Sequence, residues 1–272
     1  MKFTKFKILF LSIFFLGIQF PLLAKPKILV VVSAADWLEL DSNPKYPTGV
    51  FLNELYHPVK ALEEKGFEII YASPKGKRAT LDPESLKSKY WKSDSEREFA
   101  QKKILSDPSY LNPLSLEQIK GDNKNYVALM VPGGQGLMSD LLRDPLIPNL
   151  FEDFHRDNRP IGLICHAPAL LISLPSSNNG GGFLFSGYRF NSVTKIEEWF
   201  IETFVMKGTP KVRKISNLLK DRGMIYESSF LPGGGYATRD RNLITSQNPF
   251  SGEAFNELFL QAVNEEKEKR GL

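Results

Sequence analysis

The amino-acid sequence predicts an α/β fold with a doubly wound, mostly parallel sheet. Apolar runs of strand length alternate along the chain with segments of helical periodicity, which is the order that builds βαβ units. Several of these runs, such as KILVVVS at 27–33, are apolar without interruption, as in strands that helices bury on both faces. The 272 residues are 42% hydrophobic and 24% charged, which excludes a disordered tail, a collagen-like fibre and a disulfide scaffold.

The first βαβ unit begins with the strand at 27–33 and a helix that starts near Gly49. Thr48 is placed to cap this helix, Pro58 should kink it and Gly66 should end it. Further strands and helices then follow, with strands at 67–72, 126–132, 160–165, 188–193 and 242–246 and helices at 146–157, 166–173, 195–204 and 250–269.

Residues 73–125 interrupt this alternation. They are polar, rich in Lys, Ser and Pro, and show no clear strand. A long segment of this kind inside a compact domain is usually functional or mobile. We therefore expect an excursion with short helices that lies over an edge of the sheet or over the mouth of an active site.

The first 24 residues have the layout of a secretory signal peptide. Three lysines within the first seven residues precede an apolar run at 8–18, and Ala24 offers a small residue for cleavage. The run is short for a transmembrane helix. We expect residues 25–272 to form one secreted or periplasmic domain with no stable membrane span. The alternative is a protein anchored in a membrane by its uncleaved signal.

The charge of the chain does not indicate nucleic-acid binding. The formal net charge is +4, but three of these charges belong to the lysines that precede the apolar run. The remainder of the chain is nearly neutral, and it has no basic stripe with interleaved aromatic residues. Nucleic acid is therefore not an expected partner.

Cys165 is the only cysteine, so the chain cannot form an internal disulfide. It follows the strand at 160–164 and precedes a helix, with Gly162 before it and Pro168 after it. A nucleophile on such a turn is exposed at the top of a sheet. Backbone N–H groups there hold a developing oxyanion, and the helix dipole lowers the pKa of the thiol. The alternative is a small, buried and inert hydrophobic residue.

Neither a nucleotide site nor a metal site is indicated. The glycine turn at 133–136 lacks the third glycine of a dinucleotide fingerprint and the GK[ST] of a P-loop, so its N–H groups are better suited to face the thiol. Glu54 and His57 form only one of the two Glu-x-x-His pairs that a carboxylate-bridged metal site needs. We expect His155 to be solvated and no metal or other cofactor to be required.

Two strings around the candidate nucleophile resemble the ThiJ/PfpI superfamily: GLICHAPALL at 162–171 and VPGGQGLMSDLL at 131–142. This superfamily has the flavodoxin-like, class I glutamine amidotransferase-like fold. Three further segments, at 46–76, 81–85 and 242–251, are similar to its larger branch, which contains glyoxalase III and heat-shock chaperones. Together these segments cover most of the chain in order.

The resemblance implies roles for specific residues. Cys165 matches the nucleophile of the elbow, and His166 matches the adjoining histidine that carries protons. Glu54 matches a helix carboxylate that is usually protonated and hydrogen-bonds the cysteine. The third acid of the triad falls on Glu198, with Glu197 one residue away as the alternative.

The resemblance also assigns the oxyanion donors to Gly134 and to the N–H of His166, and it carries the expectation of a homodimer. Gln135 departs from the branch, which commonly has a histidine there, and glutamine cannot carry a proton at neutral pH. The residues alone leave another reading of the helix at 195–204, because its acidic side chains can also form a solvated face.

The most direct functional hypothesis is a glutathione-independent glyoxalase that converts methylglyoxal into lactate, or a related deglycase of glycated side chains. Its partner is a small reactive aldehyde, and its chemistry is that of a cofactor-independent lyase. Two alternatives stay open, a holdase chaperone or stress protein and a cysteine amidase or peptidase. The remaining possibilities are an inactive relative and a redox sensor in which Cys165 is oxidised to a sulfinate.

Overall fold

The computed structural model describes residues 25–177, 182–231 and 233–272. The predicted signal peptide at 1–24 lies outside the described residues. Within the described part of the chain, no helix is long and apolar enough to cross a membrane.

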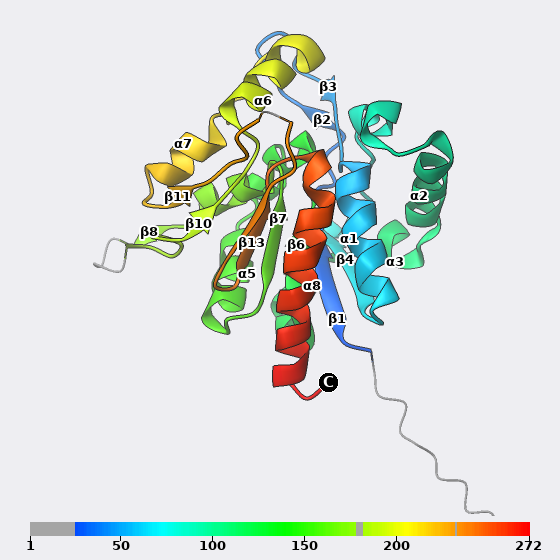
Figure 1. Ribbon diagram of the computed structural model, residues 1–272, viewed down its shortest axis with the longest axis vertical. Helices are drawn as coiled ribbons and strands as arrows, with labels where there is room; N and C mark the ends of the chain where they lie inside the picture. The colour runs from blue at the N-terminus through cyan, green and yellow to red at the C-terminus, as the bar shows by residue number, and fades with distance from the viewer. Residues whose placement is uncertain (1–24, 178–181, 232) are drawn as a thin grey trace, which may run out of the picture.

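The centre of the molecule is a seven-stranded sheet in the order β12–β13–β7–β6–β1–β4–β5 (Figure 1). All neighbouring strands run parallel except β12, which is antiparallel to β13. The predicted doubly wound fold is therefore confirmed. The strands are β1 (Lys27–Val31), β4 (Glu68–Ser73), β5 (Leu114–Ser115), β6 (Tyr126–Val131), β7 (Ile161–Ile164), β12 (Ala237–Asp240) and β13 (Leu243–Ser246).

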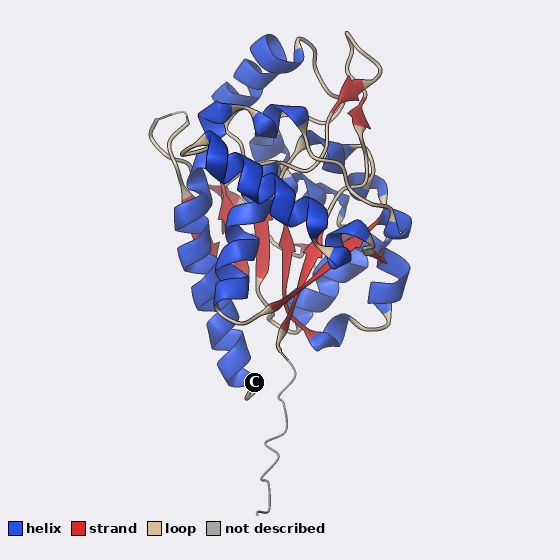
Figure 2. Cartoon of the chain, turned by 90° about the vertical axis from the view of Figure 1, so that its right-hand side faces the viewer, coloured by secondary structure: helices blue, strands red, loops and turns tan. Residues whose placement is uncertain are grey.

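Helices cover both faces of this sheet. The first helix, α1 (Leu52–Glu64), packs beside the last, α8 (Gly252–Lys269), on one face, and α5 (Leu146–Arg156) lies on the other (Figure 1). Figure 2 shows the strands enclosed between these layers. The remaining α-helices of the described residues are α2 (Asp94–Ser106), α3 (Pro108–Leu111), α4 (Leu116–Lys120), α6 (Lys195–Phe200) and α7 (Ile215–Lys220).

Short helical and strand segments connect these elements. The 3₁₀ segments are η1 (Pro74–Gly76), η2 (Pro83–Leu86), η3 (Ser88–Tyr90), η4 (Asn123–Asn125), η5 (Gln135–Met138), η6 (Leu141–Arg143), η7 (Ala167–Ser173) and η9 (Pro249–Ser251), and η8 (Ile201–Met206) is a π-helix. The two-stranded pairs are β2 (Trp37–Leu38) with β3 (Tyr46–Pro47), β8 (Ser176–Ser177) with β9 (Gly182–Phe183), and β10 (Arg189–Phe190) with β11 (Ile225–Tyr226).

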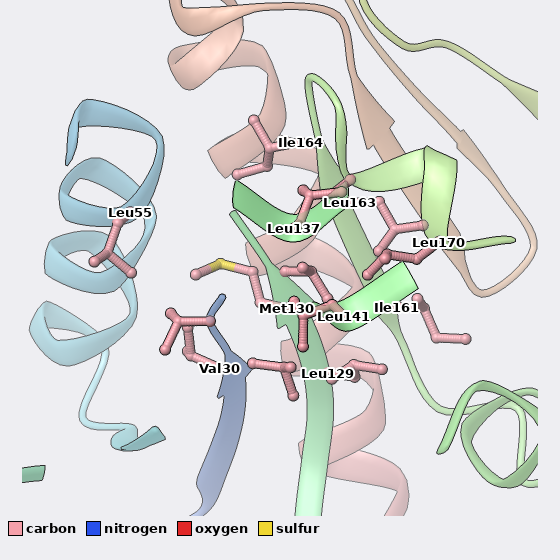
Figure 3. Close-up of a cluster of buried hydrophobic side chains, with 14 of the residues drawn as sticks. Val30, Leu55, Leu129, Met130, Leu137, Leu141, Ile161, Leu163, Ile164 and Leu170 are labelled. Carbon is pink, nitrogen blue, oxygen red and sulfur yellow. The ribbon is translucent and has the colours of Figure 1, made fainter. Parts of the chain in front are cut away.

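The core forms where helical side chains meet the apolar strands. Val30, Leu129 and Met130 from the two central strands are fully buried, as are Leu55 of α1 and Leu141 of η6 (Figure 3). Their uninterrupted burial explains why the strand sequences show no alternation. The sheet is therefore a rigid platform for the residues at its carboxyl ends.

Gly162 has a packing role that the sequence did not reveal. A Cβ atom at this position of β7 would lie 2.8 Å from ring atoms of both Phe255 and Phe259 on α8. Glycine is required because α8 packs directly against the backbone of this strand. The glycine in the strand that leads to Cys165 therefore allows α8 to pack closely against the sheet.

The predicted cap of α1 is wrong. The helix begins at Leu52, Phe51 occupies the N-cap position, and no side chain caps it. The hydroxyl of Thr48 instead donates a hydrogen bond of 2.8 Å to Asp82, which belongs to the excursion. A long-range partner thus replaces the local cap that the sequence suggested.

Other predicted elements differ at the periphery of the sheet. The strand expected at 188–193 is the two-residue β10, which pairs with β11 outside the central sheet. The excursion at 73–125 contains short helices as expected, but also the thirteen-residue helix α2 and the edge strand β5. The edge strand β12 was missed because its sequence, ATRD, is polar.

Candidate active site

The backbone at Cys165 forms a sharp elbow between β7 and η7. Its φ of 59° lies in the left-handed region, which a residue with a side chain rarely adopts. The Cys165 N–H donates to the carbonyl of Ser246 at 2.8 Å, and its own carbonyl accepts from the Val193 N–H at 3.1 Å. Contacts on both sides therefore hold the strained conformation, as is typical of a nucleophile at the end of a strand.

A cavity of about 440 Å³ opens above this elbow, at the carboxyl ends of the strands. Cys165 lies at its base and is only 5% exposed. The excursion contributes Asp82, Glu84 and Tyr90 to the lining, and α6 and η8 form the opposite side. The excursion thus lies over the mouth of the candidate site, as the sequence predicted.

Glu54 reaches the thiol from the first turn of α1. Its carboxyl is 4% exposed and lies against Gly133, where an added Cβ would collide with it and would lie 2.9 Å from the Cβ of Cys165. Burial raises the pKa of Glu54 to about 8, although the Cys165 thiol and the Gly133 N–H act in the opposite direction. The carboxyl is therefore protonated at neutral pH.

The thiol of Cys165 is not activated in the resting site. Burial raises its pKa well above the ordinary value, and the charges of Glu54 and Glu197 raise it further. The N–H of His166 lowers this pKa, but by less than burial raises it. The expectation that the following helix would lower the thiol pKa is therefore wrong, because desolvation dominates. Glu54 and Cys165 cannot both carry a negative charge in this site.

His166 is neutral and lies between the thiol and an amide. Burial lowers its pKa to about 4, against the charge of Glu197. Its Nδ1 lies 3.2 Å from the sulfur of Cys165, and its Nε2 lies 2.9 Å from Nε2 of Gln135. An amide nitrogen only donates, so Nε2 accepts and the ring proton on Nδ1 faces the sulfur. Gln135 thus holds the position that a triad carboxylate would take.

Glu198 lines a second, small cavity together with His166 but is not hydrogen-bonded to it. Its carboxylate is 6% exposed and accepts a hydrogen bond of 3.3 Å from the N–H of Ile215, and burial raises its pKa to about 7. No hydrogen bond between described residues joins it to His166. Glu202 is also buried, in an ion pair with Arg213. The alternative of a solvated acidic face is therefore wrong for both glutamates.

Glu197 is the acid that faces the cavity. Its carboxylate accepts hydrogen bonds from Asn248 Nδ2 at 2.7 Å and from the Gly233 N–H at 2.9 Å. It also closes the capping box of α6 with Thr194. The contact with Asn248 was not anticipated, although that residue belongs to the sequence segment at 242–251 that carried the resemblance. Of the two candidate acids, Glu197 is the one whose charge acts on Cys165 and His166.

Gly134 is required by the backbone of the glycine turn. Its φ is 113°, and an added Cβ would collide with the carbonyl of Gly49 and lie 3.0 Å from the nitrogen of Phe51. None of the hydrogen bonds between described residues uses the N–H of Gly134. The role of Gly134 and the His166 N–H as oxyanion donors stays a prediction that this geometry permits.

The other two histidines lie outside the cavity lining. His57 packs against Trp91 with ring centroids 5.7 Å apart. His155, expected to be solvated, is half-buried and its Nε2 lies 3.0 Å from the hydroxyl of Tyr188. Across the described ranges, no group of three or more His, Cys, Asp or Glu side chains is placed to hold a metal ion.

Replacing Glu197 and replacing Glu198 are expected to have different effects on the reactivity of the Cys165 thiol. Replacing Glu197 with glutamine keeps an N3 residue suited to the capping box but removes a charge that raises the pKa of Cys165. We expect Glu197→Gln to speed alkylation of the single cysteine by iodoacetamide about 3- to 10-fold at pH 8, because losing this negative charge increases the thiolate population.

The matched control is Glu198→Gln, which removes a carboxylate bonded to Ile215 instead. Its alkylation rate should stay within about twofold of the wild type, because Glu198 is not among the groups that shift the pKa of Cys165. Faster alkylation in the Glu198 variant alone would instead assign the triad acid to Glu198.

A doubly wound sheet that presents a strained cysteine beside a buried glutamate and a histidine defines a class I glutamine amidotransferase-like protein with a cysteine elbow. Residues 48–180 match the model of the DJ-1/PfpI family, so this part of the chain carries a DJ-1/PfpI family domain. The resemblance to the ThiJ/PfpI superfamily and to its larger branch is thereby confirmed.

Individual relatives extend over almost the whole chain. The Protein/nucleic acid deglycase HchA of Pseudomonas aeruginosa is 25% identical over 248 residues, which are 88% of this chain and 81% of that protein. The structure of Rapid Encystment Protein 24 KDa of Francisella tularensis matches with a TM-score of 0.72 and 26% identity, over 88% of this chain and 99% of that one. Glyoxalase III of Candida albicans has the same fold, with a TM-score of 0.71, 21% identity and coverage of 87% and 97%.

Proposed function

We propose that this protein is a cofactor-independent enzyme of the glyoxalase and deglycase type, with Cys165 as its nucleophile and methylglyoxal as a substrate. The observation that carries the proposal is the protonated Glu54 carboxyl, buried against the thiol at the base of an open cavity. Two relatives support it by name, since one is called a deglycase and the other a glyoxalase III.

The first step is addition of the thiol to the aldehyde. The sulfur of Cys165 forms a bond to the aldehyde carbon, and the aldehyde oxygen becomes the hydroxyl of a hemithioacetal. Glu54 supports this step because a protonated carboxyl can donate to the oxygen with one atom and accept the thiol proton with the other. The Cys165 thiol is itself one of the two hydrogen-bonding neighbours of this carboxyl, with the Gly133 N–H as the other, so the thiol proton lies within its reach.

The second step moves a proton between the two carbons. The C–H proton of the hemithioacetal is removed, an enediol forms, and a proton returns to the neighbouring carbon. The aldehyde carbon is oxidised to a thioester, and the ketone carbon is reduced to an alcohol. Glu54 can take the C–H proton with one carboxyl oxygen while it gives its own proton to the ketone oxygen, and the Nδ1–H of His166 can donate to the sulfur that carries the substrate. Water then cleaves the C–S bond and releases lactate and the free thiol.

An amidase or peptidase is less well supported by this geometry. Acyl transfer by a Cys–His pair relies on an imidazolium that a carboxylate stabilises. In this site the far nitrogen of His166 contacts Gln135, and burial lowers the pKa of the ring to about 4. The site therefore disfavours the charged histidine that such a hydrolase needs.

A holdase chaperone is a second candidate because of one specific surface. Trp199, Phe200 and Phe204 are each about half exposed and touch one another on α6 and η8. This helix lies at the outer end of the molecule, above the carboxyl ends of the strands (Figure 1). An exposed aromatic cluster of this kind can bind the apolar segments of unfolded proteins.

The proposal is tested by incubating the purified protein with methylglyoxal in the absence of glutathione and metal. We expect lactate to form in amounts equal to the methylglyoxal consumed, as measured by NMR. In D₂O, the lactate should carry deuterium at its second carbon where the enediol exchanges its proton with solvent. If a folded protein with a reduced thiol forms no lactate, the glyoxalase proposal is wrong.

A further inference from the structure

The cavity above Cys165 has two apolar sides. On one side, the rings of Phe51 and Tyr90 meet edge to face at 5.0 Å, and Tyr90 lies 5.8 Å from Phe250. On the other side, α6 and η8 present aliphatic and aromatic side chains, among them Val205 and Met206. A substrate chain that is bound to the sulfur of Cys165 and extends toward solvent therefore passes between two apolar surfaces.

The acidic side chains of the lining all have partners: Asp82 accepts a hydrogen bond from Thr48, Glu197 accepts from Asn248, and Glu84 is paired with lysines. Glu84 forms ion pairs with Lys87 and with Lys89, and it also accepts a hydrogen bond from the hydroxyl of Tyr90. Lys89 is the only cation in the described lining. The cavity thus offers no unpaired positive charge to a phosphate or carboxylate on a substrate.

The cavity is also larger than methylglyoxal requires. At about 30 Å³ for each group the size of a water molecule, its volume of about 440 Å³ accommodates on the order of fifteen such groups. Methylglyoxal has five non-hydrogen atoms. Most of the apolar surface would therefore stay in contact with water when this small substrate is bound.

We propose that the substrates of this site are reactive carbonyl compounds that carry an apolar chain or ring, such as 2-oxoaldehydes with six to eight carbons. This inference rests on the proposed function and names its substrate class. The reaction is unchanged, because the apolar group takes no part in the bonds that form and break. Its burial between Phe51 and Val205 supplies binding energy that methylglyoxal lacks.

The inference is tested by comparing methylglyoxal, phenylglyoxal and 2-oxooctanal as substrates. We expect kcat/KM for 2-oxooctanal to exceed that for methylglyoxal by at least about tenfold, since a single methylene in an apolar pocket can contribute that much. Val205→Trp, which fills the cavity, and Phe200→Ala, which removes part of one side, should each reduce this ratio. Phe99→Ala is the matched control, because Phe99 is an exposed phenylalanine on α2 outside the lining and should leave the ratio unchanged.

A second measurement separates this inference from the proposed reaction. Cys165 is the only cysteine, so the alkylation rates of the protein by N-ethylmaleimide and N-hexylmaleimide measure access of each group to the cavity. The rates with glutathione serve as the reference for the intrinsic reactivity of each reagent. We expect the hexyl reagent to react at least about tenfold faster relative to the reference, and Val205→Trp to remove the difference.

The outcomes are distinguishable. Turnover of methylglyoxal with no gain for longer chains or for the hexyl reagent overturns the substrate class and leaves the glyoxalase function standing. A hexyl preference without turnover of any 2-oxoaldehyde supports the apolar subsite and overturns the proposed reaction. A hexyl preference that survives in Val205→Trp places the effect outside the cavity and overturns the inference.

Discussion

Replacing Cys165 with alanine is expected to reduce lactate formation by at least about 10⁴-fold, because no other group in the sequence can form the thiohemiacetal bond. The fold should survive. Alanine meets the same strain as cysteine at a φ of 59°, and only one buried heavy atom is lost. We expect the free energy of unfolding to change by about 1 kcal/mol or less.

The matched control is Ser216→Ala. Ser216 is fully buried on α7, and its hydroxyl has no hydrogen-bond partner among the described residues. This variant also removes one buried heavy atom, and it should retain full turnover. Lactate formation that persists in Cys165→Ala would remove Cys165 from the mechanism. Suppression of aggregation that survives in the same variant would identify the holdase as an independent activity of the aromatic cluster on α6 and η8.

Glu54→Gln is expected to reduce kcat about 10²- to 10⁴-fold, because glutamine keeps the size of the side chain but cannot exchange a proton with the substrate. The wild-type rate should also change with pH near the pKa of Glu54, which is about 8. This pH dependence should disappear in the residual activity of the variant. An unchanged kcat in Glu54→Gln would exclude the carboxyl as the proton carrier.

The same substitution changes stability in a direction that follows from the pKa. The folded-state pKa of about 8 lies above the ordinary value of 4.5. The contribution of Glu54 to stability is therefore fully present below pH 4.5 and is lost as the pH rises toward 8. The free energy of unfolding of the wild type should therefore fall between pH 5 and pH 8. In Glu54→Gln this fall should be smaller by roughly 2–4 kcal/mol. Urea unfolding at both pH values measures the effect, with the exposed Glu64→Gln as control.

The sequence located the base of the site because strand ends and helix starts are readable. Cys165 follows an apolar run directly, and Glu54 lies in the first turn of the next helix along the chain from β1. In a parallel sheet, these positions meet at one edge. The resemblance then supplied the pairing of the two side chains, and the structure shows the glycine at 133 that permits their contact.

The sequence could not decide between Glu197 and Glu198, because adjacent residues on a helix point about 100° apart. The assignment to Glu198 rested on segment length, and a shift of one residue moves the carboxylate from the cavity to Ile215. The contact between Gln135 and His166 could not be predicted from the sequence either. It joins two loops through side-chain geometry that no local pattern encodes.

The π-helical turn of η8 has a consequence for how this site can diverge between relatives. A π-helix holds one more residue in a turn than an α-helix, so deleting one codon in η8 would restore regular helical winding. Side chains after the deletion would keep roughly their directions, because the π turn had absorbed the extra residue. The cavity would lose one lining side chain if the deleted residue were Ile201, Val205 or Met206, and Cys165 with its partners would stay in place. A single deletion could thus exchange one substrate range for another while the chemistry is inherited intact.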